Sequence, residues 1–448
     1  MSLFTTERLV PIVRRMPITT HLSNTMLLRR SFTYFERTGD HLAKHSTGQS
    51  FSSTRKSTQQ ASAPKPHTTL PLSGTLVIAL EQAIAGPFCT RQLADLGARV
   101  IKIERPGRGD FNRAHDTRVK GLCSHFVWTN RSKESLALDL KHPKDLAALK
   151  QLLAKADVMV QNLAPGATER MGLGYETLKA KHPGLIVCDI SGYGSTGPYR
   201  NKKAYDLLIQ AEAGFLSITG SPDRPAKAGI SIADIAAGTT AYNNILAALL
   251  ARHRTGRGCR LDVSMLESLS EWMSFPMYYA FDGAEPPARS GAEHASIYPY
   301  GPFGTGGEGI VMLGMQNERE WRIFCCDVLG REDLLGEERF NTTAKRSENR
   351  EDLKAIIEEV FRGADAETWL ERLQAAGIAN AKVNDMEGLW NHPQLKARNR
   401  WSEVETSVGK IPALKPAGVA DGVEARMDPV PDVDQHGEAI LEEFGIVR

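Results

Sequence analysis

The sequence lacks an apolar run long enough to cross a bilayer, which excludes an integral membrane protein. It also lacks a strong excess of charge: the formal net charge is +2, with 24% charged residues. No basic stripe interleaved with aromatic residues is present, so nucleic-acid binding is not expected. What remains is an ordinary soluble chain of 448 residues, long enough for two or three domains.

Cysteine is scarce and shows no paired spacing. Structural metal sites and disulfide frameworks usually need recurring cysteine pairs at short intervals. We therefore expect buried, reduced thiols, with neither disulfides nor zinc. The six cysteines are Cys89, Cys123, Cys188, Cys259, Cys325 and Cys326.

The stretch Leu72–Pro106 predicts one βαβ unit. Thr75–Leu80 is a short, branched apolar run typical of a buried parallel strand. Ala85–Leu96 has helical spacing and is followed by a glycine stop. Arg99–Glu104 alternates as a second strand. A right-handed crossover between the two strands commits this region to a parallel sheet covered by helices.

The turn after the first strand lacks the GxGxxG motif and offers only Gly86. A pyrophosphate therefore cannot approach this backbone as it does in dinucleotide-binding proteins. Glu104 ends the second strand, where a dehydrogenase would bind ribose, but Arg105 follows at once and better matches a phosphate. We expect no nicotinamide cofactor, and a ligand beyond the strand C-termini.

The first 68 residues are basic, rich in Ser and Thr, and poor in acids. This composition is typical of a mitochondrial transit peptide, although a disordered basic tail would share it. We predict a transit peptide and linker over residues 1–69, and import into the mitochondrial matrix.

Strands alternate with helices up to about residue 195, which predicts an α/β fold with a doubly wound parallel sheet. Further strands are expected at 136–140, 158–161, 185–190 and 260–263, and helices from Pro143 and at 204–213, 230–253 and 265–275. Beyond residue 275 the pattern predicts a loop at 281–300, a strand at 310–313, and helices at 318–329, 350–361 and 366–376.

These patterns predict four parts. They are a transit peptide and linker (1–69), a large Rossmann-like domain (70–274), a small α+β domain (275–390) and a C-terminal return segment to the large domain (391–448). The return segment is expected to be extended, because it contains Pro412, Pro416, Pro429 and Pro431.

Several segments together resemble the family III CoA-transferases, the CaiB/BaiF type that includes formyl-CoA transferase, carnitine CoA-transferase and succinyl-CoA:dicarboxylate CoA-transferases. They are AGPFCTRQLADLGARVIKIERPGRGD, NRSKESLALDLKHP, ADVMVQNLAPGATERMGLGYE, SGYGSTGPY and TGRGCRLDVSMLES, in the family's order over residues 72–395. The resemblance implies a homodimer of interlocked rings.

The resemblance also implies transfer of CoA from an acyl-CoA to a carboxylic acid. A carboxylate attacks the thioester to give an aspartyl anhydride, and the released thiolate then forms an aspartyl-CoA thioester. Such chemistry needs no metal or organic cofactor, CoA being part of the substrate. It does need donors for the oxyanion and a dry pocket.

Two aspartates compete for the role of nucleophile. Asp223, in Thr-Gly-Ser-Pro-Asp, matches the family's catalytic aspartate by position, although a turn or N-cap aspartate is the structural alternative. Asp206 matches an aspartate that the related α-methylacyl-CoA racemases carry after a histidine, whereas Tyr205 precedes it here. We favour Asp223 as the nucleophile and expect Asp206 to be a structural residue at a helix start.

By the same resemblance, nine residues are expected to bind CoA. Ile84 and Ala85 would lie beside the thioester, Arg105 and Arg170 would bind phosphates, and Tyr193 would lie near the active site. The full set is Ile84, Ala85, Arg105, Leu138, Lys141, Asn162, Arg170, Met171 and Tyr193.

Two departures from the family pattern bear on the substrate. Formyl-CoA transferase has glutamine at the position of Ile84, which argues against formate or oxalate. In place of that enzyme's mobile glycines, this chain has His294–Tyr300, a bulkier and stiffer segment that suits a larger acid.

We therefore expect a dicarboxylyl-CoA such as succinyl-CoA as donor. Spare cations at Arg113, Arg118 and Lys120 would bind the second carboxylate. An acyl-CoA racemase or epimerase, and a CoA-binding protein without turnover, are the alternatives.

Overall fold

The computed structural model describes residues 70–418 and 420–447. The chain divides into two units, residues 1–63 and 64–448, and all described residues belong to the second. The predicted transit peptide and linker lie outside the described residues. Within the described part, no helix is long and apolar enough to cross a membrane.

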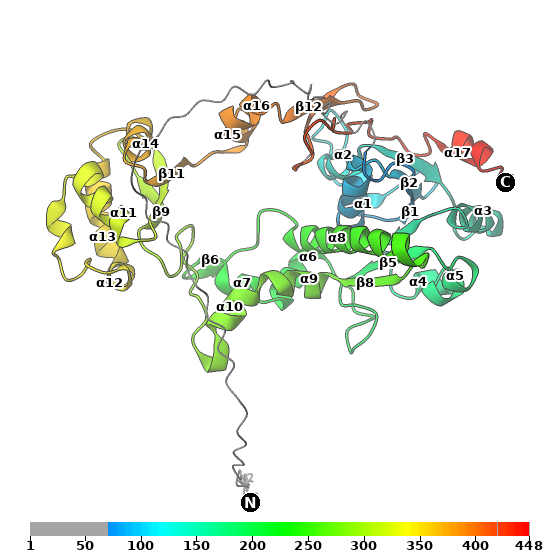
Figure 1. The fold of residues 1–448 in the computed structure, drawn as a ribbon, viewed down its shortest axis with the longest axis horizontal. Helices are drawn as coiled ribbons and strands as arrows, with labels where there is room; N and C mark the ends of the chain where they lie inside the picture. The colour runs from blue at the N-terminus through cyan, green and yellow to red at the C-terminus, as the bar shows by residue number, and fades with distance from the viewer. Residues whose placement is uncertain (1–69, 419, 448) are drawn as a thin grey trace, which may run out of the picture. The chain divides into compact units, whose positions relative to one another are not determined.

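A six-stranded parallel sheet organises the first two hundred described residues (Figure 1). Its strand order is β3-β2-β1-β4-β5-β8, so the strand order reverses between β1 and β4. Ligands in such sheets bind beyond the carboxyl ends of the strands at the point of reversal. The strands are β1 (Leu76–Leu80), β2 (Arg99–Glu104), β3 (Lys133–Ala137), β4 (Val158–Gln161), β5 (Ile186–Ser191) and β8 (Arg260–Ser264).

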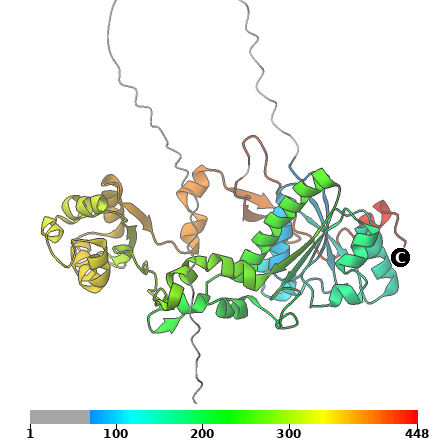
Figure 2. The same cartoon turned by 60° about the horizontal axis from the view of Figure 1, so that its bottom comes forward.

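Helices cover both faces of this sheet (Figure 2). The side chains of Val77 and Ala79 in β1 join one core, and those of Ile78 and Leu80 join the core on the other face. This alternation follows from the two-residue period of a strand. The first core is closed by α1 (Ala85–Asp95), α6 (Asp206–Glu212), α8 (Ile232–Thr255) and α9 (Met265–Trp272), and the second by α3 (Pro143–Leu153), α5 (Tyr175–Lys181) and α17 (Gly437–Glu443).

Shorter elements connect these layers. The helices are α2 (Ser124–Asn130), α4 (Ala167–Arg170), α7 (Phe215–Ile218) and α10 (Ser274–Tyr279), with 3₁₀ turns at Phe111–Ala114 and Phe281–Gly283. A two-stranded hairpin is formed by β6 (Gly220–Ser221) and β7 (Arg224–Pro225).

A further core, apart from the two that flank the parallel sheet, lies around an antiparallel sheet of order β11-β10-β9. Phe303, Phe324 and Phe361 are fully buried in it. Its strands are β9 (Tyr300–Gly304), β10 (Ile310–Gly314) and β11 (Ala379–Lys382). Its helices are α11 (Glu318–Ile323), a π-helix (Phe324–Leu329), a 3₁₀ turn (Glu332–Leu335), α12 (Thr343–Glu348), α13 (Arg350–Phe361) and α14 (Ala366–Ala375).

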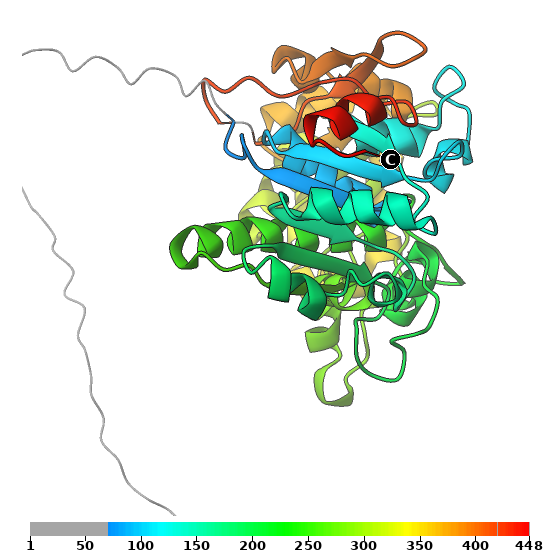
Figure 3. The ribbon, with the colours of Figure 1, turned by 90° about the vertical axis from the view of Figure 1, so that its right-hand side faces the viewer.

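The C-terminal segment contains α15 (Met386–Trp390), α16 (Pro393–Ala397) and an antiparallel pair, β12 (Trp401–Val404) and β13 (Ile411–Leu414). It then returns to the parallel sheet. The N–H of His436 donates to Ser135 O in β3, and Ile440 of α17 packs in the core on the second face of the sheet. Figure 3 shows α17, in red, beside the parallel sheet.

Most predicted elements agree with the structure, and three expectations were wrong. The strand expected at 136–140 begins earlier, at Lys133, because charged residues are buried in it. The helix expected at 265–275 is interrupted between Trp272 and Ser274. The return segment contains two short helices, α16 and α17, and is not extended throughout. The domain boundaries stay a prediction, with the two cores on either side of the expected division at 274.

Candidate active site

The predicted CoA-binding residues follow the carboxyl ends of five neighbouring strands. Ile84 and Ala85 come after β1, Arg105 after β2, and Asn162 after β4. Because parallel strands end at one edge of the sheet, this edge brings together residues as far apart in the sequence as Ile84 and Tyr193. The others are Leu138 and Lys141 after β3, Arg170 and Met171 beyond β4, and Tyr193 after β5.

The turn between β1 and α1 is held by side chains from two other strands' loops. Asn162 donates to Gln82 O and accepts from Gln82 N, both at 2.8 Å. Asp110 Oδ1 accepts the N–H of Ala83 at 3.2 Å, and Asn112 Nδ2 donates to Ala83 O at 3.2 Å. These bonds fix Ala83 in the left-handed region, at φ 61°, a conformation that costs a non-glycine residue about 1–2 kcal/mol.

A buried charge network supports this turn. Glu81, the residue after β1, receives a hydrogen bond from Lys133 Nζ at 2.7 Å and another from Thr90 Oγ1 at 2.7 Å. Lys102 Nζ lies 2.9 Å from Asp110 Oδ2 and 3.4 Å from Glu81 Oε1. Burial lowers the pKa of Lys133 to about 8, against the attraction of Glu81. The network couples β1, β2 and β3 to the loop that holds the turn.

Glu104 and Arg113 form a second buried pair, which corrects one expectation. The Arg113 guanidinium binds both Glu104 oxygens, at 2.8 and 2.7 Å, and donates to Pro431 O. Burial acts to raise the pKa of Glu104, but its bonds to Arg113, the charge of Lys102 and the bond from Ser135 lower that pKa to about 2. Arg113 is therefore a structural partner of Glu104 and not a spare cation for a substrate.

Asp206 begins α6, as expected, but its carboxylate also reaches a different helix. Oδ1 accepts the N–H of Ala233 at 2.8 Å and that of Asp234 at 3.4 Å, in the first turn of α8. Oδ2 accepts from Gln210 Nε2 at 2.7 Å. These hydrogen bonds orient the Asp206 carboxylate, which is still partly exposed.

Asp234 connects Asp206 to the turn after β1. Burial, together with the charge of Asp206, raises the pKa of Asp234 to about 7, while a hydrogen bond from the backbone N–H of Ala85 acts in the opposite direction. Like charges this close disfavour double ionisation. The raised pKa favours the protonated form of Asp234 below pH 7, beside one of the residues expected to flank the thioester.

Asp223 has a different environment. It lies in the turn of the β6–β7 hairpin, and its Oδ1 accepts from Ser221 Oγ at 2.7 Å. This hydrogen bond lowers the pKa of Asp223, with a smaller contribution from Arg289. The side chain is exposed, and in the described part of the chain no hydrogen bond or ion pair joins it to the nine predicted CoA-binding residues. Its role as nucleophile stays a prediction from resemblance.

The remaining predicted residues divide by exposure. Arg105, Lys141 and Arg170 are exposed at the sheet edge, as phosphate ligands must be. Leu138 is buried in the core, so only its backbone is available to a ligand. Met171 and Tyr193 are half-buried. These exposures are compatible with the predicted phosphate side of a CoA site.

The segment His294–Tyr300 is tied down at both ends. The imidazole ring of His294 and the phenol ring of Tyr300 stack at 5.2 Å between centroids, and Tyr298 is buried. His294 Nδ1 accepts the N–H groups of Ser296 and Ile297, at 3.2 and 3.0 Å. This restraint agrees with the expectation of a segment stiffer than a run of glycines.

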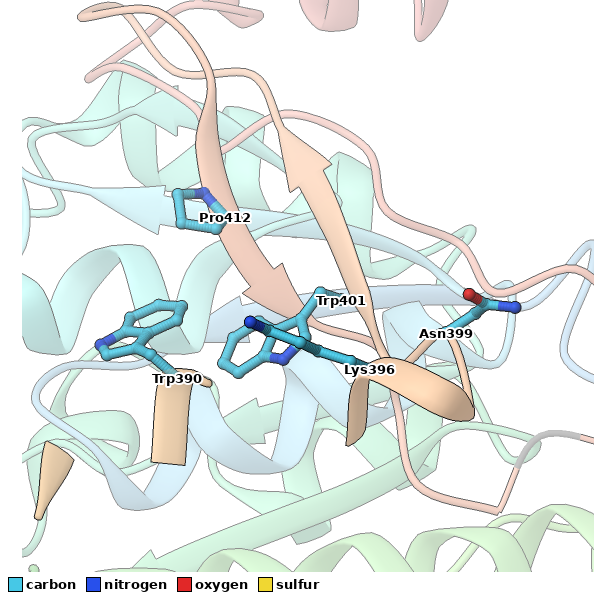
Figure 4. Close-up of a pocket in the computed structure, with 5 residues that line it drawn as sticks. All are labelled: Trp390, Lys396, Asn399, Trp401 and Pro412. Atoms are coloured by element: carbon cyan, nitrogen blue, oxygen red, sulfur yellow. The ribbon is translucent and has the colours of Figure 1, made fainter. Parts of the chain in front are cut away.

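A cavity of about 400 Å³ lies elsewhere, between α15, α16 and the β12–β13 pair (Figure 4). Two of the residues that line it, Trp390 and Trp401, stack on each other at 4.4 Å between ring centroids. None of the predicted site residues lines this cavity. Its lining consists of Trp390, Lys396, Asn399, Trp401 and Pro412.

Comparison with known proteins agrees with this arrangement. The model of CoA-transferase family III matches residues 72–437. An acyl-CoA transferase of Fusarium pseudograminearum is 36% identical over 390 residues, covering 84% of this chain and 85% of the relative. Human succinyl-CoA:glutarate CoA-transferase is 35% identical over 379 residues, covering 83% of this chain and 86% of the relative.

Among solved structures, a CAIB/BAIF family protein from Brucella suis has a TM-score of 0.76 at 32% identity, covering 84% of this chain and all of that one. The fold, the family match and these relatives thus define an α/β enzyme that transfers CoA. The chain belongs to CoA-transferase family III, and the predicted resemblance and transferase activity are confirmed.

The sequence did not identify four residues that shape the site: Asp110, Asn112, Gln210 and Asp234. Asp234 carried one usable signal, since it is an acid in the first turn of an otherwise apolar helix. Asp110 and Asn112 lie in a polar loop, where nothing local distinguishes them from solvated residues. Their contacts depend on the tertiary arrangement of the strands.

Proposed function

We propose that this enzyme exchanges CoA between a dicarboxylyl-CoA, such as succinyl-CoA, and a second small dicarboxylic acid. The human relative is named for succinyl-CoA and glutarate, both of which are dicarboxylic. Ile84 is apolar and buried beside the reacting edge, which supports an acid larger than formate or oxalate. Glutarate is the acceptor to test first.

We further propose Asp206, in place of Asp223, as the nucleophile. The observation that carries this assignment is the set of donors on the Asp206 carboxylate: the start of α8 on Oδ1 and Gln210 on Oδ2. Asp234 joins the same carboxylate to Ala85 at the β1–α1 turn. An ionised carboxylate has about four acceptor sites, so a lone pair remains for attack.

The reaction then runs through two kinds of intermediate. An Asp206 oxygen attacks the thioester carbon, the carbon–sulfur bond breaks, and CoA leaves as a thiolate. The thiolate attacks the aspartyl carbon of the resulting anhydride, which releases the donor acid and leaves an aspartyl-CoA thioester. The acceptor carboxylate repeats these two steps in reverse, forming its own CoA ester and restoring the Asp206 carboxylate. No water, metal or organic cofactor enters the balance.

The fixed β1–α1 turn supports this scheme. The hydrogen bonds from Asn162, Asp110 and Asn112 to the backbone of this turn leave it little freedom to move beside the reacting carbonyl. Preorganised groups stabilise charge in a transition state without reorganising. Arg105 and Arg170 are exposed on loops beyond β2 and β4 and would bind the phosphates of CoA.

The substrate assignment is tested by incubating the purified enzyme with succinyl-CoA and a panel of acids, and separating the CoA esters by liquid chromatography. We expect glutaryl-CoA to form faster than formyl-CoA or oxalyl-CoA. Transfer that prefers formate would contradict the dicarboxylate assignment, and transfer that prefers oxalate would contradict the larger acid that Ile84 supports. Deuterium exchange at the α-carbon of a branched acyl-CoA, without transfer, would favour the racemase alternative.

We propose that the enzyme is a homodimer with interlocked chains, as the family resemblance implies. Supporting this, α10 and the turn after it expose a series of large apolar side chains, 46–75% exposed in the single chain. Exposed patches of this kind usually mark interfaces. They are Phe275, Met277, Tyr278, Tyr279 and Phe281.

We propose the mitochondrial matrix as the location, on the basic, acid-poor composition of residues 1–69. The test is import of the radiolabelled full chain into isolated mitochondria. A shortened, protease-protected product that requires a membrane potential is expected. An uncleaved product accessible to protease would contradict the proposal.

A further inference from the structure

Three potential metal ligands converge where the polar loop after β2 meets the start of α2. They are Asp116 in the loop, Cys123 at the N-cap of α2, and His125 in its first turn. One ligand atom from each lies within 4.8 Å of the other two. A thiolate, an imidazole and a carboxylate are the ligand types that bind Zn²⁺.

Two of the three ligand separations are close to those of a tetrahedral site, and the third is within 4.8 Å. Cys123 Sγ lies 3.5 Å from Asp116 Oδ2, and His125 Nδ1 lies 3.9 Å from the same oxygen. Zinc bonds of about 2.0–2.3 Å at tetrahedral angles give ligand separations of about 3.6 Å for sulfur and oxygen and about 3.4 Å for nitrogen and oxygen. The first distance already agrees, and the second requires a shift of about half an ångström.

A second observation points to a ligand. His125 Nδ1 is buried and has no hydrogen-bond partner within the described chain. A buried polar atom without a partner costs about 1–3 kcal/mol, so native structures rarely leave one. A metal bond would satisfy this nitrogen.

Asp116 is already oriented by its surroundings. Its Oδ1 accepts the N–H groups of Arg118 and Ser124, each at 3.0 Å, and its Oδ2 accepts from Ser124 Oγ at 2.6 Å. Hydrogen bonds of this kind fix the ligands of metal sites. The ring of His115 lies edge-on to that of His125, at 5.8 Å between centroids, next to the open side of the cluster.

We propose that Asp116, Cys123 and His125 bind one Zn²⁺ ion, with water in the fourth position. On binding, the Cys123 S–H bond breaks, its proton passes to solvent, and a Zn–S bond replaces the thiol's hydrogen bond to Asp116. The carboxylate and the neutral imidazole bind without losing a proton. No electron is transferred.

This ion would hold the loop in place, and because one position is left to water, the site is of the open type and not a closed four-ligand site. It would tie the loop after β2 to α2, and the same loop carries Asp110 and Asn112, which hold the β1–α1 turn. Closing a loop with a metal stabilises the folded state by mass action. The sequence predicted no zinc because it has no cysteine pairs, but this cluster takes its ligands from three residue types.

The test uses the purified full chain, stripped with a chelator and titrated with Co²⁺ and then Zn²⁺. We expect one ion per chain, a thiolate-to-cobalt absorption band, and a rise in melting temperature with Zn²⁺. Cys123→Ala and His125→Ala should each weaken Zn²⁺ binding by about 100-fold or more. The matched controls Cys326→Ala and His294→Ala should bind as the wild type does.

If Cys123→Ala and His125→Ala still transfer CoA, both variants are folded. Absence of binding at micromolar Zn²⁺, or binding that Cys123→Ala and His125→Ala leave unchanged, would overturn the proposal. If a variant is unfolded, the cobalt spectrum of the wild type decides. A spectrum without the thiolate band would exclude Cys123 as a ligand.

Discussion

At the scale of residues, the decisive comparison is between Asp206 and Asp223. Both are aspartates near the start of an element, and sequence resemblance favoured Asp223. The structure gives Asp206 three hydrogen-bond donors and a protonated neighbour, whereas Asp223 caps an exposed hairpin turn. A nucleophile must be held in place, so the hydrogen bonds on the Asp206 carboxylate suit the chemistry better than the exposed turn of Asp223 does.

Replacing Asp206 by Asn should lower kcat by about 10³-fold or more, because an amide is not a nucleophile toward a thioester. Asp223→Asn should stay within about threefold of the wild type, because that side chain is exposed. Initial rates of glutaryl-CoA formation from succinyl-CoA measure both. The reverse ranking of the two variants would return the nucleophile to Asp223.

The pKa of Asp234, raised to about 7, predicts a pH effect on activity. Below pH 7 the group is neutral. Above pH 7 it ionises and places a second negative charge beside Asp206, opposing the charge that develops on the oxyanion and thiolate. We expect kcat/KM to fall by up to tenfold per pH unit above 7, and Asp234→Asn to remove that fall. An identical pH profile in the variant would refute this role.

The same raised pKa has a consequence for stability, with the sign reversed from the usual aspartate. The folded state holds a proton that the unfolded state loses near pH 4, so folding becomes less favourable as pH rises from about 4 to 7. The free energy of unfolding of Asp234→Asn should decline less than that of the wild type between pH 4 and pH 7. Urea titrations at pH 5 and pH 7.5 measure the difference.

At the scale of elements, the βαβ unit could be predicted closely. Apolar, branched runs such as Leu76–Leu80 leave few alternatives to a buried strand, and α1, β2, β4 and α13 begin where the sequence indicated. Charged strands were harder. Lys133 begins β3 with its side chain fully buried, and only a partner 52 residues away, Glu81, makes that possible.

The site itself was predicted only in part, for a related reason. The strand ends that carry Ile84, Arg105 and Asn162 follow from the pattern and the resemblance. The contacts of Asp206 with the first turn of α8 span 27 and 28 residues, and no local signal encodes them. The helix α17 was missed because proline-rich sequence precedes it and it is only seven residues long.

The Glu104–Arg113 pair gives a prediction at this scale. Arg113→Ala should lower the free energy of unfolding by about 3 kcal/mol, since it leaves a buried carboxylate partly unpaired. Arg118→Ala, at an exposed position in the same loop, should change it by less than about 0.5 kcal/mol. Chemical unfolding at pH 7 compares the two.

The Glu104–Arg113 pair should also contribute less to the free energy of unfolding at acidic pH. Because the pKa of Glu104 is lowered to about 2, its contribution is complete above pH 4.5 and is lost as pH falls toward 2. If Arg113 instead bound the substrate, Arg113→Ala would raise KM for the acid and leave stability unchanged. That outcome would restore the expectation made from the sequence.

At the scale of the whole molecule, two cores support different tasks. The parallel sheet and its helices position the strand ends of the proposed site. The core around the antiparallel sheet carries the restrained segment His294–Tyr300. The C-terminal segment returns to β3 through His436 and α17. The family membership and the exposed apolar side chains of α10 support an assembly of two chains.

The dimer gives a prediction that light scattering can check. The wild-type chain should have twice the mass of one chain. Tyr278→Asp should raise the monomer fraction, because it places a charge in the proposed interface. Val408→Asp, on a turn between β12 and β13, is the matched control and should remain dimeric. A monomeric wild type would exclude the interlocked assembly.

The measurement that tests the central claim most directly is intact-protein mass spectrometry after incubation with succinyl-CoA alone. The wild type and Asp223→Asn should both carry an adduct of CoA mass, which hydroxylamine converts to a hydroxamate at Asp206. Asp206→Asn should carry none. An adduct that persists in Asp206→Asn and disappears in Asp223→Asn would contradict the account.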